Sequence, residues 1–295
     1  MAKEKIPVYD ICSLGKAHEG NDDFLADRFS DYLGKYYDHL HFPHKHAFFH
    51  LVLFTKGTGT HTIDFSTFDV KPRQVYFMVP GQVHSWHFTG NTDGYIINFS
   101  ASFFKSFLQN ESYLDRFSFF SGISEEGVSQ LAPDVFAKAG ELLEQILGYV
   151  SDMRKHADMI KVLLLQLFMV IEDVQAVKQQ GAVPQQKLVL LKGFRRLIDA
   201  HYRTMRLPGE FADLLYVTPN HLNALCQDLV GKTAGELIRD RVLLEAKRLL
   251  ANAKMTITEV AYDLNFQDNS YFNRFFKKYT GQTPDEFRKS ITELK

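Results

Sequence analysis

The sequence predicts a two-domain α+β protein, in which an N-terminal antiparallel β-barrel with flanking helices precedes an all-α domain of two helix-turn-helix units joined by a long helix. Two observations lead to this fold class: short apolar runs separated by turn residues up to residue 99, and a helical pattern after residue 187 that repeats itself. A length of 295 residues suits two domains, because single domains usually hold roughly 100 to 200 residues. We expect the first domain at 1–178, a linker at 179–186 and the second domain at 187–295.

The N-terminal half has the pattern of an antiparallel sandwich or barrel. Apolar and aromatic runs alternate with turns rich in Gly, Pro and Asn, such as Lys56–Gly59 and Thr89–Gly94. The expected strands are 50–55, 60–65, 74–79, 84–88 and 95–99.

The periodicity changes after residue 100. Leu142, Ile146 and Val150 recur at a spacing of four, which predicts amphipathic helices between residues 134 and 175. These helices either pack on the barrel within one chain or pair with a second protomer. The following polar segment, Gln179–Gln186, contains one Gly and one Pro, so we expect it to end the helix and to link the domains.

Charge and cysteine content restrict the class of protein. Residues 185–295 hold 18 Lys and Arg against 13 Asp and Glu, whereas the rest of the chain holds 16 against 22. A basic C-terminal third favours a polyanionic partner. Cys12 and Cys226 lie in different predicted domains and suggest no disulfide, and no segment has the pattern of a signal peptide or a membrane span. We therefore expect a cytoplasmic protein without membrane association.

The C-terminal domain contains an internal repeat. Ala212, Leu215 and Val217 correspond to Ala261, Leu264 and Phe266 at a spacing of 49, and Leu222, Leu225, Gly231, Thr233, Glu236 and Leu237 correspond to Phe272, Phe275, Gly281, Thr283, Glu286 and Phe287 at a spacing of 50. Each copy has a short helix, a turn, and a second helix that ends near a Gly and precedes a capping box, Thr233–Glu236 or Thr283–Glu286. This order predicts two helix-turn-helix units.

A helix over Thr233–Ala251 is expected to join the two units. Its 19 residues would span about 28 Å, and successive major grooves on one face of double-stranded DNA lie about 34 Å apart. One monomer could therefore place the second helix of each unit in adjacent grooves of a tandem, non-palindromic site.

The candidate DNA contacts are the polar residues on those second helices. In the second copy Asn269, Ser270, Asn273 and Arg274 suit base edges, and Tyr271, Lys277 and Lys278 suit phosphates; in the first copy the candidates are Asn220, His221, Asn223 and Gln227. For any single residue, simple exposure on a helical bundle is an equal alternative. A plain bundle does not account for two matched turns, two matched capping boxes and a spacer of suitable length.

The segment Ile257–Arg288 resembles the signature of the AraC/XylS family of transcription regulators. It departs from the family at Asn265, where Gly is common, but Asn tolerates a positive φ and should preserve the turn. The resemblance is strong over about the last hundred residues and looser over the barrel. It implies a promoter-binding regulator, most often an activator, that is controlled by a small-molecule effector, dimerises through its N-terminal half and acts on RNA polymerase.

Histidines cluster in the N-terminal half. His44 and His46, followed by His84, resemble the two metal-binding motifs of cupin barrels, and alternate residues of a strand point the same way. The acidic ligand typical of the first motif has no clear counterpart, so we expect a cupin-like barrel with a ligand pocket or structural hydrogen bonds, no catalytic metal and no cofactor. The pocket candidates are His44, His46, His50, His84, Trp86 and Tyr95.

The alternative function is a cupin-type metalloenzyme with a DNA-binding appendage. No Ser-His-Asp or Cys-His triad, P-loop or dinucleotide fingerprint indicates other catalysis, so we expect a protein that is not an enzyme.

Overall fold

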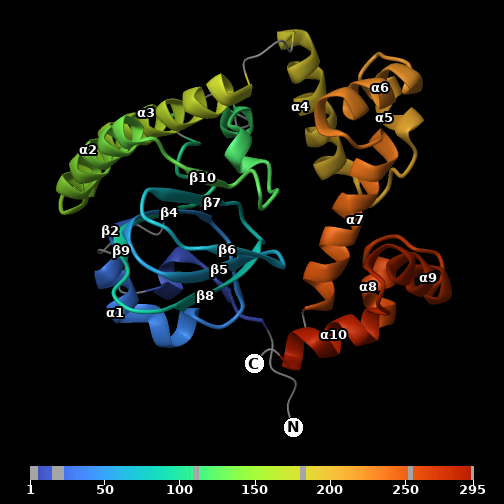
Figure 1. Ribbon diagram of the computed structural model, residues 1–295, viewed down its shortest axis with the longest axis horizontal. Helices are drawn as coiled ribbons and strands as arrows, with labels where there is room; N and C mark the ends of the chain where they lie inside the picture. The colour runs from blue at the N-terminus through green and yellow to red at the C-terminus, as the bar shows by residue number, and fades with distance from the viewer. Residues whose placement is uncertain are drawn as a thin grey trace. The chain divides into compact units, whose positions relative to one another are not determined.

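The computed structural model of the chain describes residues 6–14, 23–105, 107–108, 110, 113–179, 184–251 and 255–293. The chain divides into two compact units, one of Pro7–Gly181 and one built on Ala182–Lys295 (Figure 1). In the segment 179–186, which was expected to be a linker, residues 180–183 lie outside the described residues, while Gln179 ends one helix and Gln185 begins the next. Within the described ranges, no helix combines the length and the apolar character needed to cross a membrane.

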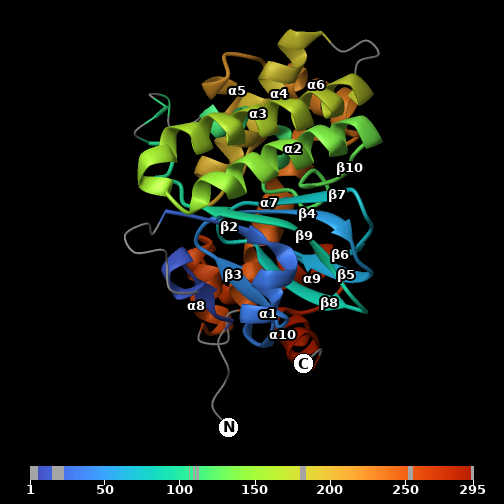
Figure 2. The same cartoon turned by 90° about the vertical axis from the view of Figure 1, so that its left-hand side faces the viewer.

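The first unit contains two five-stranded sheets in the part that the structure describes. Its strands are β1 (Val8–Tyr9), β2 (Phe24–Arg28), β3 (His44–His46), β4 (Phe49–Lys56), β5 (Gly59–Ile63), β6 (Ser66–Asp69), β7 (Gln74–Met78), β8 (Val83–Phe88), β9 (Asp93–Phe99) and β10 (Val128–Gln130). One sheet has the order β1-β3-β8-β5-β6 and the other β10-β7-β4-β9-β2, and every pair except β1–β3 is antiparallel. The hydrogen-bonded order ends at an edge strand on each side, so the strands form a sandwich rather than a closed barrel (Figure 2).

The alternation of side chains along β4 separates two cores. Val52 and Phe54 belong to a cluster between the sheets, which also contains Trp86 of β8, whereas Leu51 and Leu53 face the opposite side of their sheet. This follows from the two-residue period of a strand. The first unit is therefore built in three layers: a sheet, a second sheet, and the helices that cover the outer face of the second sheet.

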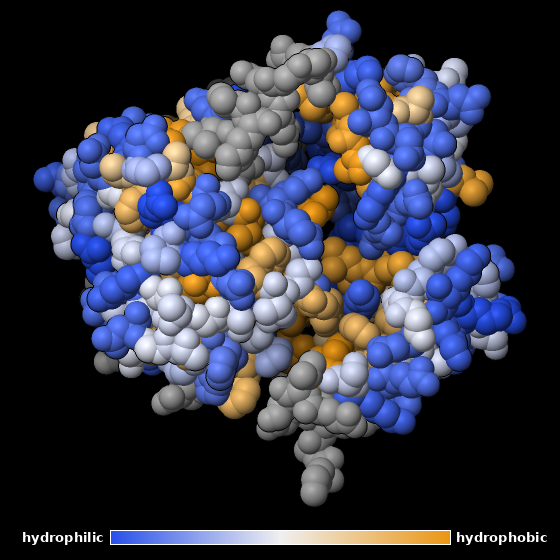
Figure 3. All heavy atoms as spheres, viewed as in Figure 1, coloured by the Kyte–Doolittle hydropathy of each residue, from blue (hydrophilic) through white to orange (hydrophobic). Residues whose placement is uncertain are grey.

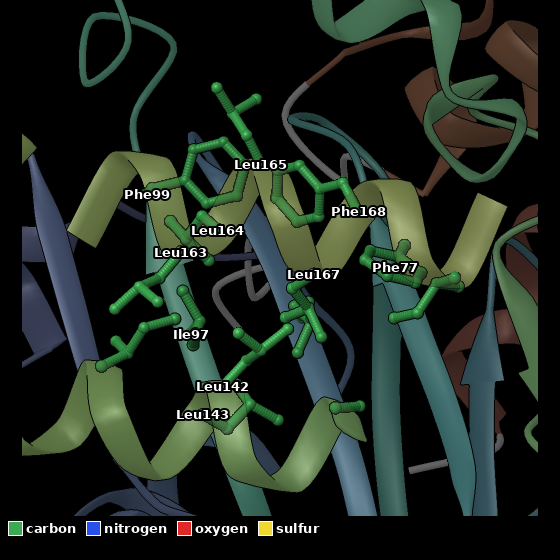
Figure 4. Packing of buried hydrophobic residues seen from close by; sticks show 14 of the residues in the cluster. Phe77, Ile97, Phe99, Leu142, Leu143, Leu163, Leu164, Leu165, Leu167 and Phe168 are labelled. Atoms are coloured by element: carbon green, nitrogen blue, oxygen red, sulfur yellow. The ribbon is translucent and has the colours of Figure 1, made fainter. Parts of the chain in front are cut away.

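Two long helices form the third layer. The helices α2 (Pro133–Val150) and α3 (Met153–Gln179) cover the β10-β7-β4-β9-β2 sheet, and their Leu142, Leu164 and Phe168 pack on Phe77 and Phe99 of that sheet (Figure 4). The remaining helices are α1 (Phe29–Leu40) and three short 3₁₀ helices, η1 (Ile11–Leu14), η2 (Tyr113–Arg116) and η3 (Ser118–Phe120).

Within its described residues, the second unit consists of helices joined by short turns and loops, without strands. Its helices are α4 (Gln185–His201), α5 (Pro208–Leu214), α6 (Pro219–Val230), α7 (Ala234–Leu250), α8 (Ile257–Asp263), α9 (Asn269–Thr280) and α10 (Pro284–Glu293). Repeat-related residues share its core, since Leu222 of α6 and Phe272 of α9 are both fully buried. The fold class predicted from the sequence, strands followed by a helical domain with a long central helix, is confirmed.

The five expected strands are all present, with ends within two residues of those predicted. The apolar pattern gave no strand at β1, β2, β3, β6 or β10, which have at most five residues each; for β3, with the sequence His-Lys-His, only the histidine spacing indicated a strand. Such short polar runs carry no alternation long enough to distinguish them from loops.

Candidate nucleic-acid interface and interior ligand site

The turns of the two helix-turn-helix units have equivalent backbone hydrogen bonds. In α5–α6 the amide of Val217 donates to the carbonyl of Ala212 at 3.0 Å, and in α8–α9 the amide of Phe266 donates to the carbonyl of Ala261 at 2.9 Å. The donors and the acceptors are each 49 residues apart. The repeat seen in the sequence is therefore a repeat of backbone structure.

The residue before each of these donors adopts a left-handed conformation. Tyr216 has a φ of 55° and Asn265 a φ of 58°. Asn enters this region more readily than most residues, so the turn survives the departure from Gly at Asn265. Tyr216 enters it at greater cost, and its side chain is 96% exposed, so it gains little packing in return.

Side-chain caps start both second helices. The hydroxyl of Thr218 accepts from the amide of His221 at 3.1 Å, and a carboxylate oxygen of Asp268 accepts from the amide of Tyr271 at 2.6 Å. These caps satisfy amides that a helix start leaves without intrahelical partners.

Gly residues end the same helices, and capping boxes start the next ones. Gly231 and Gly281 have φ values of 68° and 81°. The predicted capping boxes are confirmed: in Thr233–Glu236 and in Thr283–Glu286 the Thr hydroxyl accepts from the Glu amide, and the Glu carboxylate accepts from the Thr amide. The helix that follows each unit therefore begins with the same capping interactions.

The candidate DNA contacts lie on the exposed sides of α6 and α9. All four candidates on α6 are exposed, and on α9 Asn269 and Asn273 are half-buried while Ser270, Tyr271, Arg274, Lys277 and Lys278 are exposed. The atoms over α9, at the right of the space-filling view, are mainly hydrophilic (Figure 3). The structure therefore leaves a polar face on each second helix.

Asn223 and Asn273 occupy equivalent positions in the repeat but have different partners. The side-chain oxygen of Asn223 accepts from the amide of Ala234, the first residue of α7, at 2.9 Å. The residue equivalent to Ala234 is Pro284, which has no amide proton. The side chain of Asn273 instead donates to Asn269, at 2.8 Å to its carbonyl and 2.9 Å to its side-chain oxygen. Asn223 thus has a structural role that Asn273 lacks.

The two second helices also differ in charge. Arg274, Lys277 and Lys278 of α9 correspond to Ala224, Gln227 and Asp228 of α6. Asp228 moreover pairs with Lys187 at 2.6 Å. Attraction to DNA phosphates, which dominates salt-dependent affinity, is therefore concentrated on α9.

The loop between α4 and α5 fixes the second helix-turn-helix unit relative to the first. Arg203 pairs with Asp263 of α8 at 3.2 Å, and Arg206 donates to the carbonyl of Leu264 at the end of α8. The Arg206 guanidinium also lies 5.3 Å from the ring centroid of Phe266. These contacts supplement α7, whose 17 residues span about 25 Å, in setting the separation of α6 and α9.

Among the described residues of the first unit, five histidines are buried: His44, His46, His50, His61 and His84. Several of their ring nitrogens lie close together. The Nε2 atom of His46 lies 3.0 Å from Nε2 of His44 and 3.4 Å from Nε2 of His84, and Nδ1 of His84 lies 3.0 Å from Nε2 of His61. His50 stands slightly apart, with Nδ1 2.7 Å from the side-chain oxygen of Asn98.

Burial keeps these imidazoles neutral at physiological pH. Loss of solvation lowers the pKa of His44 to about 4 and that of His50 to about 3. It also lowers the pKa values of His46, His61 and His84 well below the ordinary value, and repulsion among the histidines acts in the same direction. Neutral imidazole nitrogens can accept hydrogen bonds or bind a metal.

Several polar atoms of this interior have no hydrogen-bond partner among the described residues. They are Nδ1 of His46 and His61, Nε2 of His50, the hydroxyl of Tyr32, Nε1 of Trp86 and Nδ2 of Asn98. Buried polar groups are seldom left unpaired, so this interior is suited to a polar ligand.

The structure brings together five of the six pocket candidates. His44, His46, His50, His84 and Trp86 are all buried and within ring-contact distance of at least one other member of the group. Tyr95 instead lies in the core between β9 and the helices, where its hydroxyl donates to Glu144 at 2.6 Å.

Strand alternation explains the separate position of Tyr95. Ile96 belongs to the cluster between the sheets, so its neighbour Tyr95 faces the other side. Asn98, which contacts His50, and Tyr32, which contacts Trp86, were not among the pocket candidates predicted from the sequence. Asn98 carried a usable signal, because it is a polar residue within the apolar run of β9 and pairs in register with His50.

Comparisons with known proteins match both units. A family model described as an AraC-like ligand binding domain matches residues 32–169, and one described as a helix-turn-helix domain matches residues 211–290. Together they cover most of the sandwich, α2, part of α3 and both helix-turn-helix units.

Curated relatives are similar over different lengths. The transcriptional regulator YijO of Escherichia coli is 25% identical over 170 residues, which are 58% of each chain, and the arabinose operon regulatory protein of the same organism is 24% identical over 55% of this chain and 59% of its own. The chain thus spans somewhat more than half the length of these two. The transcriptional activator RhaR of an Enterobacter species is 21% identical over 92% of this chain and 93% of its own.

Among solved structures, ToxT of Vibrio cholerae with a bound unsaturated fatty acid aligns over 92% of this chain and 96% of its own, with 12% identity and a TM-score of 0.43.

Proposed function

Because this chain belongs to the AraC/XylS family of transcription regulators, we propose that it binds a tandem promoter site through α6 and α9 and responds to a small-molecule effector held between its two sheets. The observation that carries the proposal is the pair of helix-turn-helix units with the same turn hydrogen bonds, joined by α7. In this assignment residues 1–178 form the cupin-like domain that senses the effector. Residues 179–186 link the two domains, and residues 187–295 bind DNA.

Two fixed helices and one connecting helix suit a tandem site. In a helix-turn-helix unit the second helix enters the major groove, where its side chains reach base edges. The 17 residues of α7 span about 25 Å, and α6 and α9 lie beyond its two ends along the chain, which favours a fit to the groove spacing of about 34 Å. Asn273 and Arg274 are our candidates for base readout, because both side-chain types pair with purine edges in the major groove.

The interior between the sheets is the proposed effector site. The residues that we assign to it are His44, His46, His50, His84 and Trp86, supported by the unpartnered polar atoms around them. Effector binding is expected to change promoter affinity or the arrangement of protomers, as coupling between two sites requires.

We further propose a cytoplasmic homodimer that acts as an activator and contacts RNA polymerase. Met159, Val162 and Met169 are exposed and recur on α3 at spacings of three and seven, so they form an apolar stripe that a second copy can cover. The activator role follows the relative RhaR, whose name states it. The relatives give no support to the alternative of a cupin-type metalloenzyme.

Selection of DNA by the full-length protein tests the proposal. Wild type is expected to enrich a motif of two blocks about one helical turn apart from a random pool. N273A/R274A should lose one block, whereas D285A/K289A, which removes an exposed ion pair of 2.7 Å on α10, should select the same motif as wild type. Enrichment of no motif, or of a two-fold symmetric one, contradicts the proposal.

A further inference from the structure

Three imidazoles converge at one point between the sheets. His44 and His46 extend from β3, and His84 of β8 pairs in register with His44. One nitrogen from each of the three lies within 4.8 Å of those from the other two, and Nε2 of His46 is 3.0 Å and 3.4 Å from Nε2 of His44 and of His84. A tetrahedral ion with nitrogen ligands at about 2.0–2.1 Å holds those ligands about 3.3 Å apart, so the observed separations have the right size.

Neighbouring groups orient two of these rings for metal binding. Nδ1 of His44 lies 2.8 Å from the carbonyl of Phe42, which cannot donate, so this nitrogen carries the proton and Nε2 presents a lone pair. Nδ1 of His84 lies 3.0 Å from Nε2 of His61, and donation to His61 leaves Nε2 of His84 as a second lone pair. Metal-binding histidines are commonly held in this way by an acceptor at the other ring nitrogen.

Hydrogen bonding within the cluster does not satisfy these lone pairs. A single N–H on Nε2 of His46 can be directed at His44 or at His84, but it cannot form a good hydrogen bond with both. His50 adds another buried Nε2 without a partner among the described residues; its Nδ1 is held by Asn98, and its ring centroid is 4.8 Å from that of His46. A cation accepts several lone pairs at once, which no arrangement of neutral imidazoles achieves.

From this convergence we propose that the interior of the first unit binds one divalent transition-metal ion through His44, His46 and His84, with His50 or an exogenous atom as the fourth ligand. Imidazole donors favour Zn²⁺, Ni²⁺, Cu²⁺ or Fe²⁺ over Mg²⁺ and Ca²⁺. This inference rests on the proposed function in one respect: the interior that the proposed function assigns to an effector is the interior that would hold the metal ion. Its test measures metal binding and not DNA binding, so the two proposals fail separately.

Titration of the untagged full-length protein tests the site directly. After treatment with EDTA and removal of the chelator, the protein is titrated with Zn²⁺ by calorimetry and with Co²⁺ by visible absorption. The expected result is one ion per chain, with the intense ligand-field bands of tetrahedral Co²⁺. Absence of stoichiometric binding of both ions to folded wild-type protein overturns the proposal.

Variants then assign the ligands. H46Q and H84Q are each expected to weaken binding at least 100-fold, and H61L about 10- to 100-fold, because it removes the acceptor that orients His84. The matched control is H87Q, on the same strand as His84 but exposed, which should bind as wild type does. Unchanged affinity in folded H46Q and H84Q overturns the proposal.

A measurement on wild type alone covers the possibility that these variants do not fold. X-ray absorption at the Zn edge of the loaded protein should show nitrogen ligands at about 2.0 Å with the outer-shell scattering of imidazole rings. A first shell of sulfur, or of oxygen without imidazole scattering, overturns the assignment.

Discussion

Replacing Asn223 by Ala separates structural stabilisation from DNA contact. The substitution removes the oxygen that accepts from the amide of Ala234, a residue with no exposed surface at the start of α7. We expect N223A to destabilise the second unit while leaving base discrimination close to that of wild type. The equivalent substitution N273A should leave stability close to that of wild type and weaken base discrimination. Pro284, the residue equivalent to Ala234, has no amide proton that could lose a partner.

The size of the effect follows from two opposing contributions. A buried donor left without its partner costs about 1–3 kcal/mol, whereas replacing Asn by Ala inside a helix recovers up to about 0.7 kcal/mol. With the full recovery, N223A should therefore lose about 0.3–2.3 kcal/mol of unfolding free energy. N273A gains the same helix propensity and loses only its bonds to Asn269, so it should stay within about 0.5 kcal/mol of wild type.

Two spectroscopic signals distinguish the units in the full-length protein. Trp86 is the single Trp and lies in the first unit, so its fluorescence follows the sandwich, while far-ultraviolet circular dichroism follows the helices of both units; a change in dichroism without a change in fluorescence therefore reports the second unit. N223A should shift the dichroism transition in urea and leave the fluorescence transition in place. Binding to the selected DNA should weaken about fivefold to 150-fold in N273A, for about 1–3 kcal/mol of lost base contact. Equal destabilisation by the two substitutions would refute the assignment of Asn223 as a cap.

Three further variants have defined outcomes. K277A should lower the slope of log affinity against log salt by about 0.9, measured by fluorescence anisotropy, because it removes one phosphate contact; an unchanged slope means that Lys277 faces solvent. Y216N should raise the unfolding free energy by up to about 1 kcal/mol in urea, since Asn adopts a positive φ more readily and the exposed ring loses little packing. In E236Q/E259Q the stability difference from wild type should be present at pH 7 and shrink as the pH falls below the ordinary Glu value of 4.5. Hydrogen bonds from Thr amides lower the pKa of both carboxyls in the folded state, so their stabilisation is lost on acidification, and a difference that persists at pH 3 contradicts this origin.

The second unit was the more predictable of the two. Its repeat, turns, helix ends and capping boxes are local features, each set by a few residues close in sequence, such as Thr233 and Glu236. The hydrogen bond from Arg206 to the carbonyl of Leu264 at the end of α8 was not predictable. It joins residues 58 apart, and nothing in the local sequence of Arg206 selects its acceptor. The structural role of Asn223 was missed for the same reason.

In the first unit the sequence predicted strands better than it predicted their arrangement. The histidine spacing placed His44 and His46 on one strand face, and the structure confirms that they converge with His84. Tyr95 was grouped with them because it is aromatic and lies on a strand, but one residue of register puts it on the other face of the sheet. Whether the sheets close into a barrel depends on the pairing of edge strands far apart in the chain, which local patterns do not encode.

The most direct test of tandem binding is hydroxyl-radical footprinting of the full-length protein on the DNA that it selects. The account predicts two protected regions on one face of the duplex, about one helical turn apart, with unrelated sequences in the two blocks, and loss of one region in N273A/R274A. A single protected region in wild type, or two regions related by two-fold symmetry that both disappear in the variant, would contradict reading of adjacent grooves by one chain.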